Sequence, residues 1–499
     1  MNIRKLLLIT TLSILTACGN DQRQGDNRGT NPPVPPPAKA ALPANGKEFE
    51  NQHGCRACHP FAEKVHAGLD CSGCHGGNPQ ASKQPEAHLG LVATPGDPAH
   101  LQKYCGPCHA EQTATIAASR HFTLTGEVNP VRRHFGATKD LATARDIPQT
   151  PRPDTALALA DDLLRRRCLG CHVYSRGDDF AATRHGTGCA ACHLEYRAGK
   201  LLSHRFLAAP GDEQCRTCHY GNRVGGDYYG DFEHDLKKDY RTPFLTDGAY
   251  PDRPYGLEQH GLQPDVHQRG GLICRDCHGG LHQGNDTTIS CAACHLWRAG
   301  QPLPGANLHA DKGRLQIQLQ ANNHLLPVPP TRNPAHARFG KNVDCAVCHA
   351  QWGFNDREAH LLRSDVEDFQ AWEDLLVQGN FEAETQLLNS LYTSKEMAPA
   401  MTDTFTGQSR PGLWLQLFAL RRWEEPLLGR DSRGQLRVMR PSLDLHLTWV
   451  DEAGKTVFDA VTGKGSGLRP YTPHTIGKAG AFYRLRLAED ASSPHPVSK

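Results

Sequence analysis

The sequence predicts a mostly irregular fold in which short α-helices wrap around an array of prosthetic groups, followed by a C-terminal α+β region that holds none. Three observations predict this fold. The phrase Cys-x-x-Cys-His occurs nine times between residues 55 and 349. The text between the copies is rich in Gly, Pro and Asp and has few long periodic segments. Residues 361–499 contain no copy, and they show helix-like and strand-like patterns instead.

Each Cys-x-x-Cys-His is typical of c-type haem attachment. The two thiols form thioethers with the haem vinyl groups, and the following His gives the iron its proximal nitrogen. The array is therefore predicted to consist of nine haem c groups. The predicted thioether residues are Cys55, Cys58, Cys71, Cys74, Cys105, Cys108, Cys168, Cys171, Cys189, Cys192, Cys215, Cys218, Cys274, Cys277, Cys291, Cys294, Cys345 and Cys348. The predicted proximal iron ligands are His59, His75, His109, His172, His193, His219, His278, His295 and His349.

The cysteine count agrees with this interpretation. The chain has 19 Cys, and the nine motifs use all of them except Cys18. Cys-x-x-Cys pairs also occur in zinc sites, which are the structural alternative. Zinc ligation, however, does not require a His directly after every second Cys.

Residues 1–17 are predicted to be a lipoprotein signal peptide. Arg4 and Lys5 precede a short apolar stretch that ends at Leu15. The text Leu-Thr-Ala-Cys that ends at Cys18 resembles a bacterial lipobox, which implies cleavage before Cys18 and lipidation of its thiol. Gly19 then favours sorting to the outer membrane. The alternative is an ordinary cleavable signal that leaves a free thiol at Cys18.

Residues 18–46 are predicted to be a Pro-rich tether, because the run from Pro32 to Pro37 favours an extended chain and nothing nearby could form a core. Residues 47–360 are predicted to be the nine-haem cytochrome c region. The motif spacing divides this region into three pair-plus-single modules, which begin at Cys55, Cys168 and Cys274. One longer helix is expected at residues 154–167, capped by Asp154 and stabilised by pairs from Asp161 and Asp162 to Arg165 and Arg166.

The sixth ligands of the irons follow from the residue counts. The chain has only four Met, and none of them lies in the haem region of the mature protein, whereas it has 28 His. Bis-histidine ligation is therefore possible at every haem, and it predicts low midpoint potentials. The candidate distal ligands are His66, His121, His134, His185, His204, His234, His267, His282 and His336. For each of them, the alternative is a surface histidine or one that only supports a ligand.

Several stretches between residues 160 and 350 resemble the large multihaem c-type cytochromes of metal- and mineral-reducing bacteria, of the outer-membrane lipoprotein type. They are residues 188–199, 214–225, 240–243 and 265–278. The resemblance implies electron transfer across or beyond the outer membrane, with His267 as an iron ligand.

Residues 361–499 are predicted to form a haem-free α+β region. Helices are expected from Ser364 to Leu376 and from Asn380 to about Tyr392. A strand is expected at residues 443–449, because apolar and polar residues alternate there, and residues 413–420 and 482–487 are further strand candidates. His474 either reaches back to an iron or is a loop histidine.

The charge balance excludes some partners. The chain has a formal net charge of +2, and the two propionates of each predicted haem would make the net charge of the whole protein negative. A negatively charged protein is not expected to bind nucleic acid. We expect other multihaem cytochromes or redox partners, an outer-membrane porin or an extracellular acceptor instead. The protein is predicted to face the periplasm or the cell surface while its lipid anchors it to the membrane.

The predicted function is electron transfer along nine closely spaced, mostly bis-His haems, in extracellular or anaerobic respiration. This function is not that of an enzyme. The alternative is a multihaem reductase with one open haem, acting on a small oxidised nitrogen or sulfur compound. Some such enzymes use Cys-x-x-Cys-Lys, which this chain lacks. A third possible function is passive storage of electrons, which the sequence does not distinguish from electron transfer.

Overall fold

The computed structural model describes residues 54–59, 66, 69–221, 224–234, 258–280, 288–354, 358–367, 380–393, 398–417 and 423–480. The chain divides into two units between His53 and Gly54, and all described residues belong to the second unit. The predicted signal peptide, Cys18, the tether, His282 and the strand expected at 482–487 lie outside the described residues. So does the side chain of His234.

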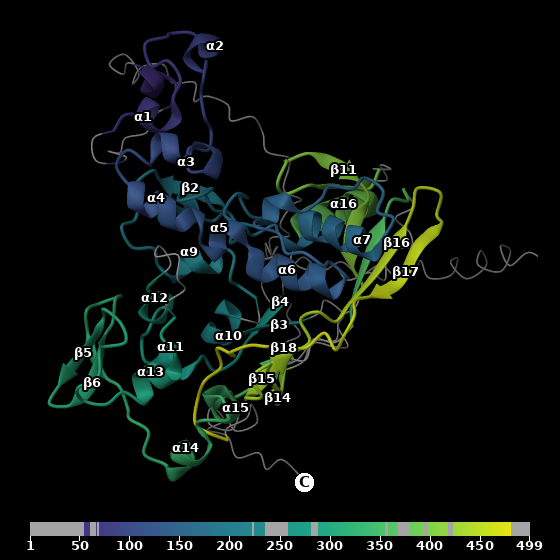
Figure 1. The fold of residues 1–499 in the computed structure, drawn as a ribbon. Helices are drawn as coiled ribbons and strands as arrows, with labels where there is room; N and C mark the ends of the chain where they lie inside the picture. The colour runs from purple at the N-terminus through teal and green to yellow at the C-terminus, as the bar shows by residue number, and fades with distance from the viewer. Residues whose placement is uncertain are drawn as a thin grey trace, which may run out of the picture. The chain divides into compact units, whose positions relative to one another are not determined.

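The helices are short, from four residues in α2 to 13 in α16 (Figure 1). The α-helices are α1 Cys71–His75, α2 Gln84–Ala87, α3 Pro98–Tyr104, α4 Ala110–Ala117, α5 Arg120–Thr123, α6 Thr125–His134, α7 Ala156–Leu163, α8 Ala190–His193, α9 Asp212–Arg216, α10 Gly225–Tyr229, α11 Val266–Arg269, α12 Cys274–Cys277, α13 Cys291–His295, α14 Pro334–Phe339, α15 Cys345–His349 and α16 Phe381–Thr393. The other helical turns are η2 Gly54–Ala57, η3 Ala144–Asp146 and the π-turn η4 Leu164–Cys168.

The strands form several small sheets. They are β1 Glu195–Arg197, β2 Lys200–Ser203, β3 Asp231–His234, β4 Glu258–Gly261, β5 Leu308–Asp311, β6 Arg314–Gln318, β7 Leu325–Pro327, β8 Gly353–Phe354, β9 Ala359–Ser364, β10 Ala400–Thr402, β11 Ser409–Pro411, β12 Leu413–Gln416, β13 Trp423–Glu424, β14 Leu427–Arg430, β15 Leu436–Arg440, β16 Leu445–Val450, β17 Thr456–Thr462 and β18 Arg469–Pro470. The strand orders are β1-β2, β3-β4, β5-β6-β7, β13-β8, β10-β11, β14-β15-β18 and β12-β9-β16-β17.

This architecture corrects the predicted fold class. The fold is mixed, with 30% helix and 20% strand, and it is not a mostly irregular helical fold wrapped around a haem array. The missed strands lie partly between the motifs. In β6, Leu315 and Ile317 are buried while their neighbours are not, and they join Leu308 and Leu319 in a small core. The alternation of buried and less buried residues in β6 is only five residues long, and the flanking segments are rich in Gly and Pro. The sequence pattern therefore did not identify this strand.

The largest core lies between the four-stranded sheet and two helices. In this sheet β9 is parallel to β16, and the outer strands β12 and β17 are antiparallel to their neighbours. Leu361, Leu413 and Leu447 of the sheet pack with Leu159 and Leu163 of α7 in one buried cluster. Figure 1 shows α7 beside β16 and β17, and α16 packs against β12. Residue 360, the predicted end of the haem region, lies within β9.

The structure tests the helix predictions one by one. The helix expected at 154–167 appears as α7, which continues through η4, and its cap is Thr155, whose side chain accepts from the Ala158 N–H. The second C-terminal helix appears as α16, and the strand expected at 443–449 appears as β16. The helix expected from Ser364 is wrong at its start, because Ser364 ends β9 and pairs with Leu413.

A buried carboxylate joins α7 to the C-terminal sheet. Asp162, whose side chain is fully buried, lies 3.2 Å from Arg166, 3.3 Å from Arg363 and 3.5 Å from Arg410. It also accepts a 2.9 Å hydrogen bond from Nε1 of Trp414. The pair with Arg166 is the predicted i,i+4 pair, whereas the other partners come from distant segments.

Two further buried pairs support the same contact. Asp161 pairs with Arg132 of α6 at 2.7 Å, and Arg165 pairs with Asp403 at 2.6 Å. The predicted pair of Asp161 with Arg165 is therefore replaced by two long-range pairs. Burial raises the pKa of Asp161. For Asp403, burial acts in the same direction, but the hydrogen bond and charge of Arg165 outweigh it and hold the pKa below its usual value.

We expect Asp162→Asn to lower the free energy of unfolding by about 3–5 kcal/mol, because the change leaves buried guanidinium groups without their carboxylate. Denaturant unfolding of the full-length protein measures this loss. The control is Asp140→Asn. Asp140 also pairs with an arginine, Arg133, but both side chains are about half exposed, at 52% and 54%. This control should cost less than about 1 kcal/mol. Equal losses for the two variants would contradict the interpretation.

The depressed pKa of Asp403 predicts how its contribution to stability depends on pH. A carboxyl group with a lowered folded-state pKa stabilises the fold above its unfolded value of 3.8, and this contribution disappears as the pH falls through the lower folded value. The stability difference between the natural protein and Asp403→Asn should therefore be largest near neutral pH and shrink below about pH 4. Unfolding curves of both proteins over this range provide the measurement. A pH-independent difference would rule out the charged pair as its source.

Candidate metal centres

The Cys-x-x-Cys-His segments fold as single helical turns, except the copy that begins at Cys168, where a π-turn ends at the first Cys. The copies that begin at Cys71, Cys291 and Cys345 are themselves the helices α1, α13 and α15. In the copies that begin at Cys55 and Cys215, the N–H of the His donates to the carbonyl of the first Cys at 2.9 Å. Residues i, i+3 and i+4 share one face of a helical turn. Both thiols and the imidazole of such a copy therefore lie on the same side.

Polar caps fix where several of these turns begin. The side chain of Asp70 accepts from the Gly73 N–H at 2.8 Å, and that of Asp344 accepts from the Ala346 N–H at 3.0 Å. Ser290 accepts in the same way at the start of α13. These caps satisfy helical N–H groups that would otherwise have no partner. The residue directly before the first Cys thus sets the position of the motif.

Backbone carbonyls fix the tautomer of four motif imidazoles. In each case the Nδ1 atom lies within hydrogen-bonding distance of a carbonyl oxygen: His75 of Val92 at 2.8 Å, His193 of Leu207 at 2.6 Å, His295 of Pro329 at 2.8 Å and His349 of Gly477 at 2.9 Å. A carbonyl oxygen only accepts, so Nδ1 must carry the proton. The Nε2 atom of the neutral ring then keeps its lone pair for a metal.

A second histidine faces six of the nine motif imidazoles among the described residues. The ring-centroid distances are 6.1 Å for His59–His88, 5.9 Å for His109–His66, 6.2 Å for His219–His121, 6.3 Å for His278–His474, 6.1 Å for His295–His267 and 6.1 Å for His349–His336. The centroid distances are nearly equal in the six pairs, although the angle between the two imidazole planes varies from 8° to 85°.

This separation fits two imidazoles that bind one iron from opposite sides. A metal–imidazole bond is about 2 Å long in zinc sites, so two such bonds in line place the ring centres roughly 6 Å apart. Direct stacking brings rings closer. His360 and His446, neither of which belongs to a motif, stack with their centroids 4.6 Å apart. Each of these centres offers two thiols that could form the thioether bonds of a c-type haem and two imidazoles that could bind its iron. The residues present therefore fit a c-type haem.

Two of the second imidazoles have anchors of their own. Nδ1 of His267 lies 2.9 Å from Oδ1 of Asp265, which is only 2% exposed. Nδ1 of His336 lies 3.1 Å from the carbonyl oxygen of Asn333. In both cases Nε2 is left as the nitrogen available to a metal.

The structure brings four of the predicted distal candidates opposite a motif imidazole: His66, His121, His267 and His336. It also pairs His88 with His59, although His88 was not among the candidates. His474, for which the sequence left open a reach to an iron or a place in a loop, lies with its ring 6.3 Å from that of His278. Four of the candidates, His66, His185, His267 and His336, lie a few residues before a motif. His88 follows its own partner motif, and His474 lies almost 200 residues from His278, so no sequence signal identified them.

Other candidates have different surroundings. His134 packs edge-on against Phe135. His185 is buried, with Nδ1 2.6 Å from the Gly186 carbonyl oxygen and Nε2 3.5 Å from Sγ of Cys218. His204 is half-buried in the loop after β2.

The motif that begins at Cys168 differs from the others. His172 is 2% exposed and stacks on Phe405, with centroids 4.5 Å apart and planes within 5°. The Tyr174 N–H donates to its Nδ1 at 3.0 Å, and its Nε2 is buried without a hydrogen-bond partner in the described part of the chain. Burial, and then the nearby His185 and Arg145, lower the pKa of His172 to about 3. Because Nδ1 accepts this hydrogen bond, the proton of the neutral ring lies on Nε2, so His172 differs from the four motif imidazoles whose Nδ1 donates to a carbonyl oxygen.

Thiols of different motifs lie close together. The thiols of four pairs lie close enough to shift each other's pKa: Cys105 and Cys189, Cys171 and Cys218, Cys215 and Cys274, and Cys291 and Cys345. The neighbouring Cys291 lowers the pKa of Cys345 to about 7, whereas burial raises the pKa of Cys192 to about 12. All eighteen motif Cys are described, and none of them forms a disulfide. These contacts link motifs that are far apart in the sequence.

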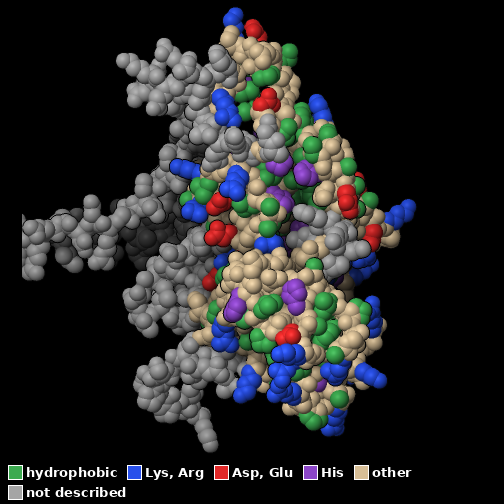
Figure 2. Space-filling model, turned by 90° about the vertical axis from the view of Figure 1, so that its left-hand side faces the viewer, with side chains coloured by type: hydrophobic (Ala, Val, Ile, Leu, Met, Phe, Trp, Pro, Cys, Tyr) green, Lys and Arg blue, Asp and Glu red, His purple; other side chains and the backbone are tan. Residues whose placement is uncertain are grey.

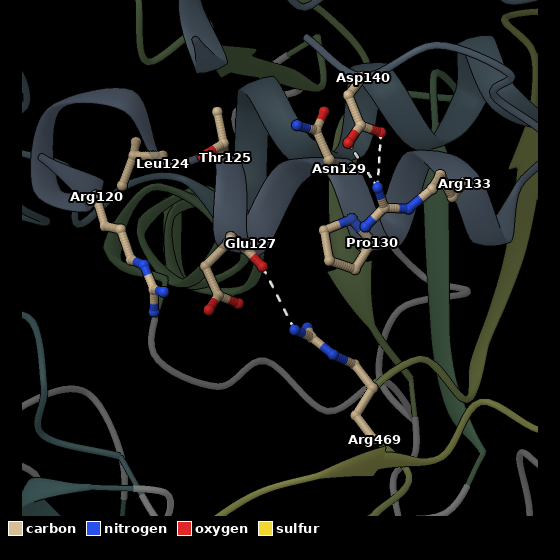
Figure 3. Close-up of a pocket in the computed structure, with 10 residues that line it drawn as sticks. Arg120, Leu124, Thr125, Glu127, Asn129, Pro130, Arg133, Asp140 and Arg469 are labelled. Carbon is tan, nitrogen blue, oxygen red and sulfur yellow. Dashed lines mark hydrogen bonds and ion pairs between the residues drawn. The ribbon is translucent and has the colours of Figure 1, made fainter. Parts of the chain in front are cut away.

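A polar pocket of about 530 Å³ lies beside α5 and α6 (Figure 3). Arg133 pairs with Asp140 at 2.6 Å on its wall, and Arg469 donates to the Gly126 carbonyl oxygen at 3.4 Å. Arg120, which directly precedes His121, also lines the pocket. On the face shown in Figure 2, several His side chains reach the surface.

Comparison with protein-family models, with curated proteins and with solved structures finds no match to this chain. Within the described ranges, no group of three or more His, Cys, Asp or Glu side chains is arranged to hold a metal ion. None of the described helices combines the length and the apolar character needed to cross a membrane.

Proposed function

We propose that this chain is a multihaem c-type cytochrome that carries electrons along closely spaced, mostly bis-His haems. The observation that carries the proposal is the set of six imidazole pairs, each with one member from a Cys-x-x-Cys-His motif and centroids 5.9–6.3 Å apart. One pair at this distance could be a coincidence of packing. Six pairs with the same separation and different ring angles support a common ligand between the rings.

The side chains have separate roles in this proposal. The two Cys of each motif would hold the haem through thioether bonds, and the motif His would be an iron ligand. The second His of a pair would be the other histidine ligand. Bound haem iron supplies one-electron chemistry, alternating between its ferric and ferrous states. Carbonyls such as that of Gly477 keep the proton on Nδ1 and so hold the ligand nitrogen ready in both states.

Contacts between motifs support transfer along the chain. The neighbouring sulfurs bring together the motif at Cys105 with that at Cys189, the motif at Cys215 with that at Cys274, and the motif at Cys291 with that at Cys345. The motif at Cys168 meets the one at Cys215 through Cys171 and Cys218. Haems attached at adjoining motifs would lie close enough for electrons to pass without a moving part.

The proposed location and partners rest on the sequence. Cys18 in its lipobox-like context supports a lipid anchor in the outer membrane, with residues 18–46 as a tether. Redox partners would then be other multihaem cytochromes, an outer-membrane porin or an extracellular acceptor, in extracellular or anaerobic respiration. Imidazole as both axial ligands suits this role, because it gives low midpoint potentials.

A multihaem reductase is the second candidate, and the motif at Cys168 is where its open iron would be. His172 accepts a backbone hydrogen bond at Nδ1, and its ring stacks on Phe405. A reductase needs one iron with an open coordination site.

Mass spectrometry and ferric spectroscopy of the protein from its natural host test the proposal. We expect the mass of nine covalently attached haems and a ferric spectrum dominated by low-spin iron. A mass without added haem would overturn the proposal. A distinct high-spin component that binds nitrite or hydroxylamine and turns it over would favour the reductase.

We expect Asp265→Asn to raise the midpoint potential of one haem. The carboxylate of Asp265 accepts from Nδ1 of His267 and so makes the imidazole a stronger donor, which favours ferric iron. A tenfold loss of this preference corresponds to about 59 mV for one electron. Spectroelectrochemical titration of the holoprotein measures the shift. Asp311→Asn, an exposed change in β5, is the control and should leave the titration unaltered. An unchanged titration for Asp265→Asn would show that this carboxylate does not act on a haem ligand.

A further inference from the structure

The C-terminal segment 474–477 lies among three of the imidazole centres. His474 faces His278, with the ring centroids 6.3 Å apart and the planes inclined by 31°. Nδ1 of His278 lies 3.1 Å from Oγ1 of Thr288, and when this hydroxyl accepts the proton of Nδ1, the lone pair of the ring is on Nε2. Tyr228 packs edge-on against the His474 ring, with the centroids 6.3 Å apart. The distance between the two imidazoles matches that of the other five pairs.

Hydrogen bonds hold this segment in place on one side. Thr475 is 1% exposed, and its Oγ1 donates to the Trp352 carbonyl oxygen at 2.8 Å. The Gln351 N–H donates to the Thr475 carbonyl oxygen at 2.9 Å. The backbone directly after His474 is therefore fixed against the chain that follows the ninth motif.

On the other side, the segment reaches the anchor of a second centre. The Ile476 N–H donates to Oδ2 of Asp265 at 2.6 Å, and the Val266 N–H donates to the Ile476 carbonyl oxygen at 2.9 Å. The other oxygen of Asp265 is the one that holds His267. One carboxylate thus connects the C-terminal segment to the centre of His267 and His295.

The next residue reaches a third centre. The carbonyl oxygen of Gly477 accepts from Nδ1 of His349, and the Gly477 N–H donates to the His349 carbonyl oxygen at 2.9 Å. Four consecutive residues therefore touch the centres of the seventh, eighth and ninth motifs. These residues therefore contact a histidine of a candidate centre, or a residue that holds such a histidine, at each of the three centres.

We propose that His474 is the sixth iron ligand opposite His278, and that residues 475–477 position the ligands of the two following centres. This inference rests on the proposed haem function. Neutral His474 would donate its Nε2 lone pair to the iron in place of a water molecule, with no change in oxidation state. The region without haem motifs thereby supplies a ligand and locks three neighbouring centres into one geometry.

His474→Ala in the holoprotein tests the assignment. We expect nine haems by mass, because the thioether bonds do not involve His474, and about one ninth of the ferric haem in a high-spin state by electron paramagnetic resonance, since the chain has nine motifs. Added imidazole should restore the low-spin signal. The matched control is His446→Ala, since His446 stacks on His360 and faces no motif His in the described chain. Its spectrum should remain low-spin.

A second variant covers the case in which His474→Ala does not fold. His474→Met keeps a ligand, so the iron should remain low-spin while one midpoint potential rises, because a thioether ligand raises it. A wholly low-spin spectrum for His474→Ala, or an unchanged redox titration for His474→Met, would overturn the assignment. A natural protein without nine haems would instead refute the proposed function, which keeps the two failures distinct.

Discussion

The hydrogen bond from a histidine Nδ1 to a fixed acceptor is the interaction on which the candidate centres depend. A neutral imidazole can bind a metal through Nε2 only when its proton is on Nδ1. Carbonyl oxygens of Val92, Leu207, Pro329 and Gly477 accept this proton at four motifs. These acceptors lie up to 128 residues from their histidines. The orientation of each of these four imidazoles therefore depends on the position of the loop whose carbonyl oxygen accepts the Nδ1 proton.

Buried charges make the C-terminal region part of the same structure. Asp162 of α7 meets Arg363 of β9 and Arg410 of β11 within 3.5 Å. Removing charges from water is costly, and such a cluster is tolerated only where every partner is held in place. The large hydrophobic core between α7 and the four-stranded sheet provides that support. Through α7 and η4, this core also positions the motif that begins at Cys168.

Local signals in the sequence predicted part of the fold. The spacing of Asp161 and Asp162 from Arg165 and Arg166 identified the helix that contains α7, although its cap is Thr155 and not the predicted Asp154. The alternation around Leu447 identified β16. The small sheets were missed because strands such as β5 and β7 have only four and three residues, and backbone pairing with a neighbour stabilises them more than their own pattern does. Ser364 was assigned to a helix because the pattern around it is apolar, whereas pairing with β12 and β16 makes it the end of a strand.

The sequence by itself determined the first half of each centre, because two thiols and one imidazole at positions i, i+3 and i+4 share a face of a single helical turn wherever that turn is placed. Only the tertiary structure decided the second imidazole. A residue that approaches from the opposite side has no fixed spacing from the motif, and so His66 comes before its partner His109, His88 comes after His59, and His474 reaches His278 from the C-terminal region. The packing of the intervening loops sets these pairs, and this packing involves residues from the whole chain.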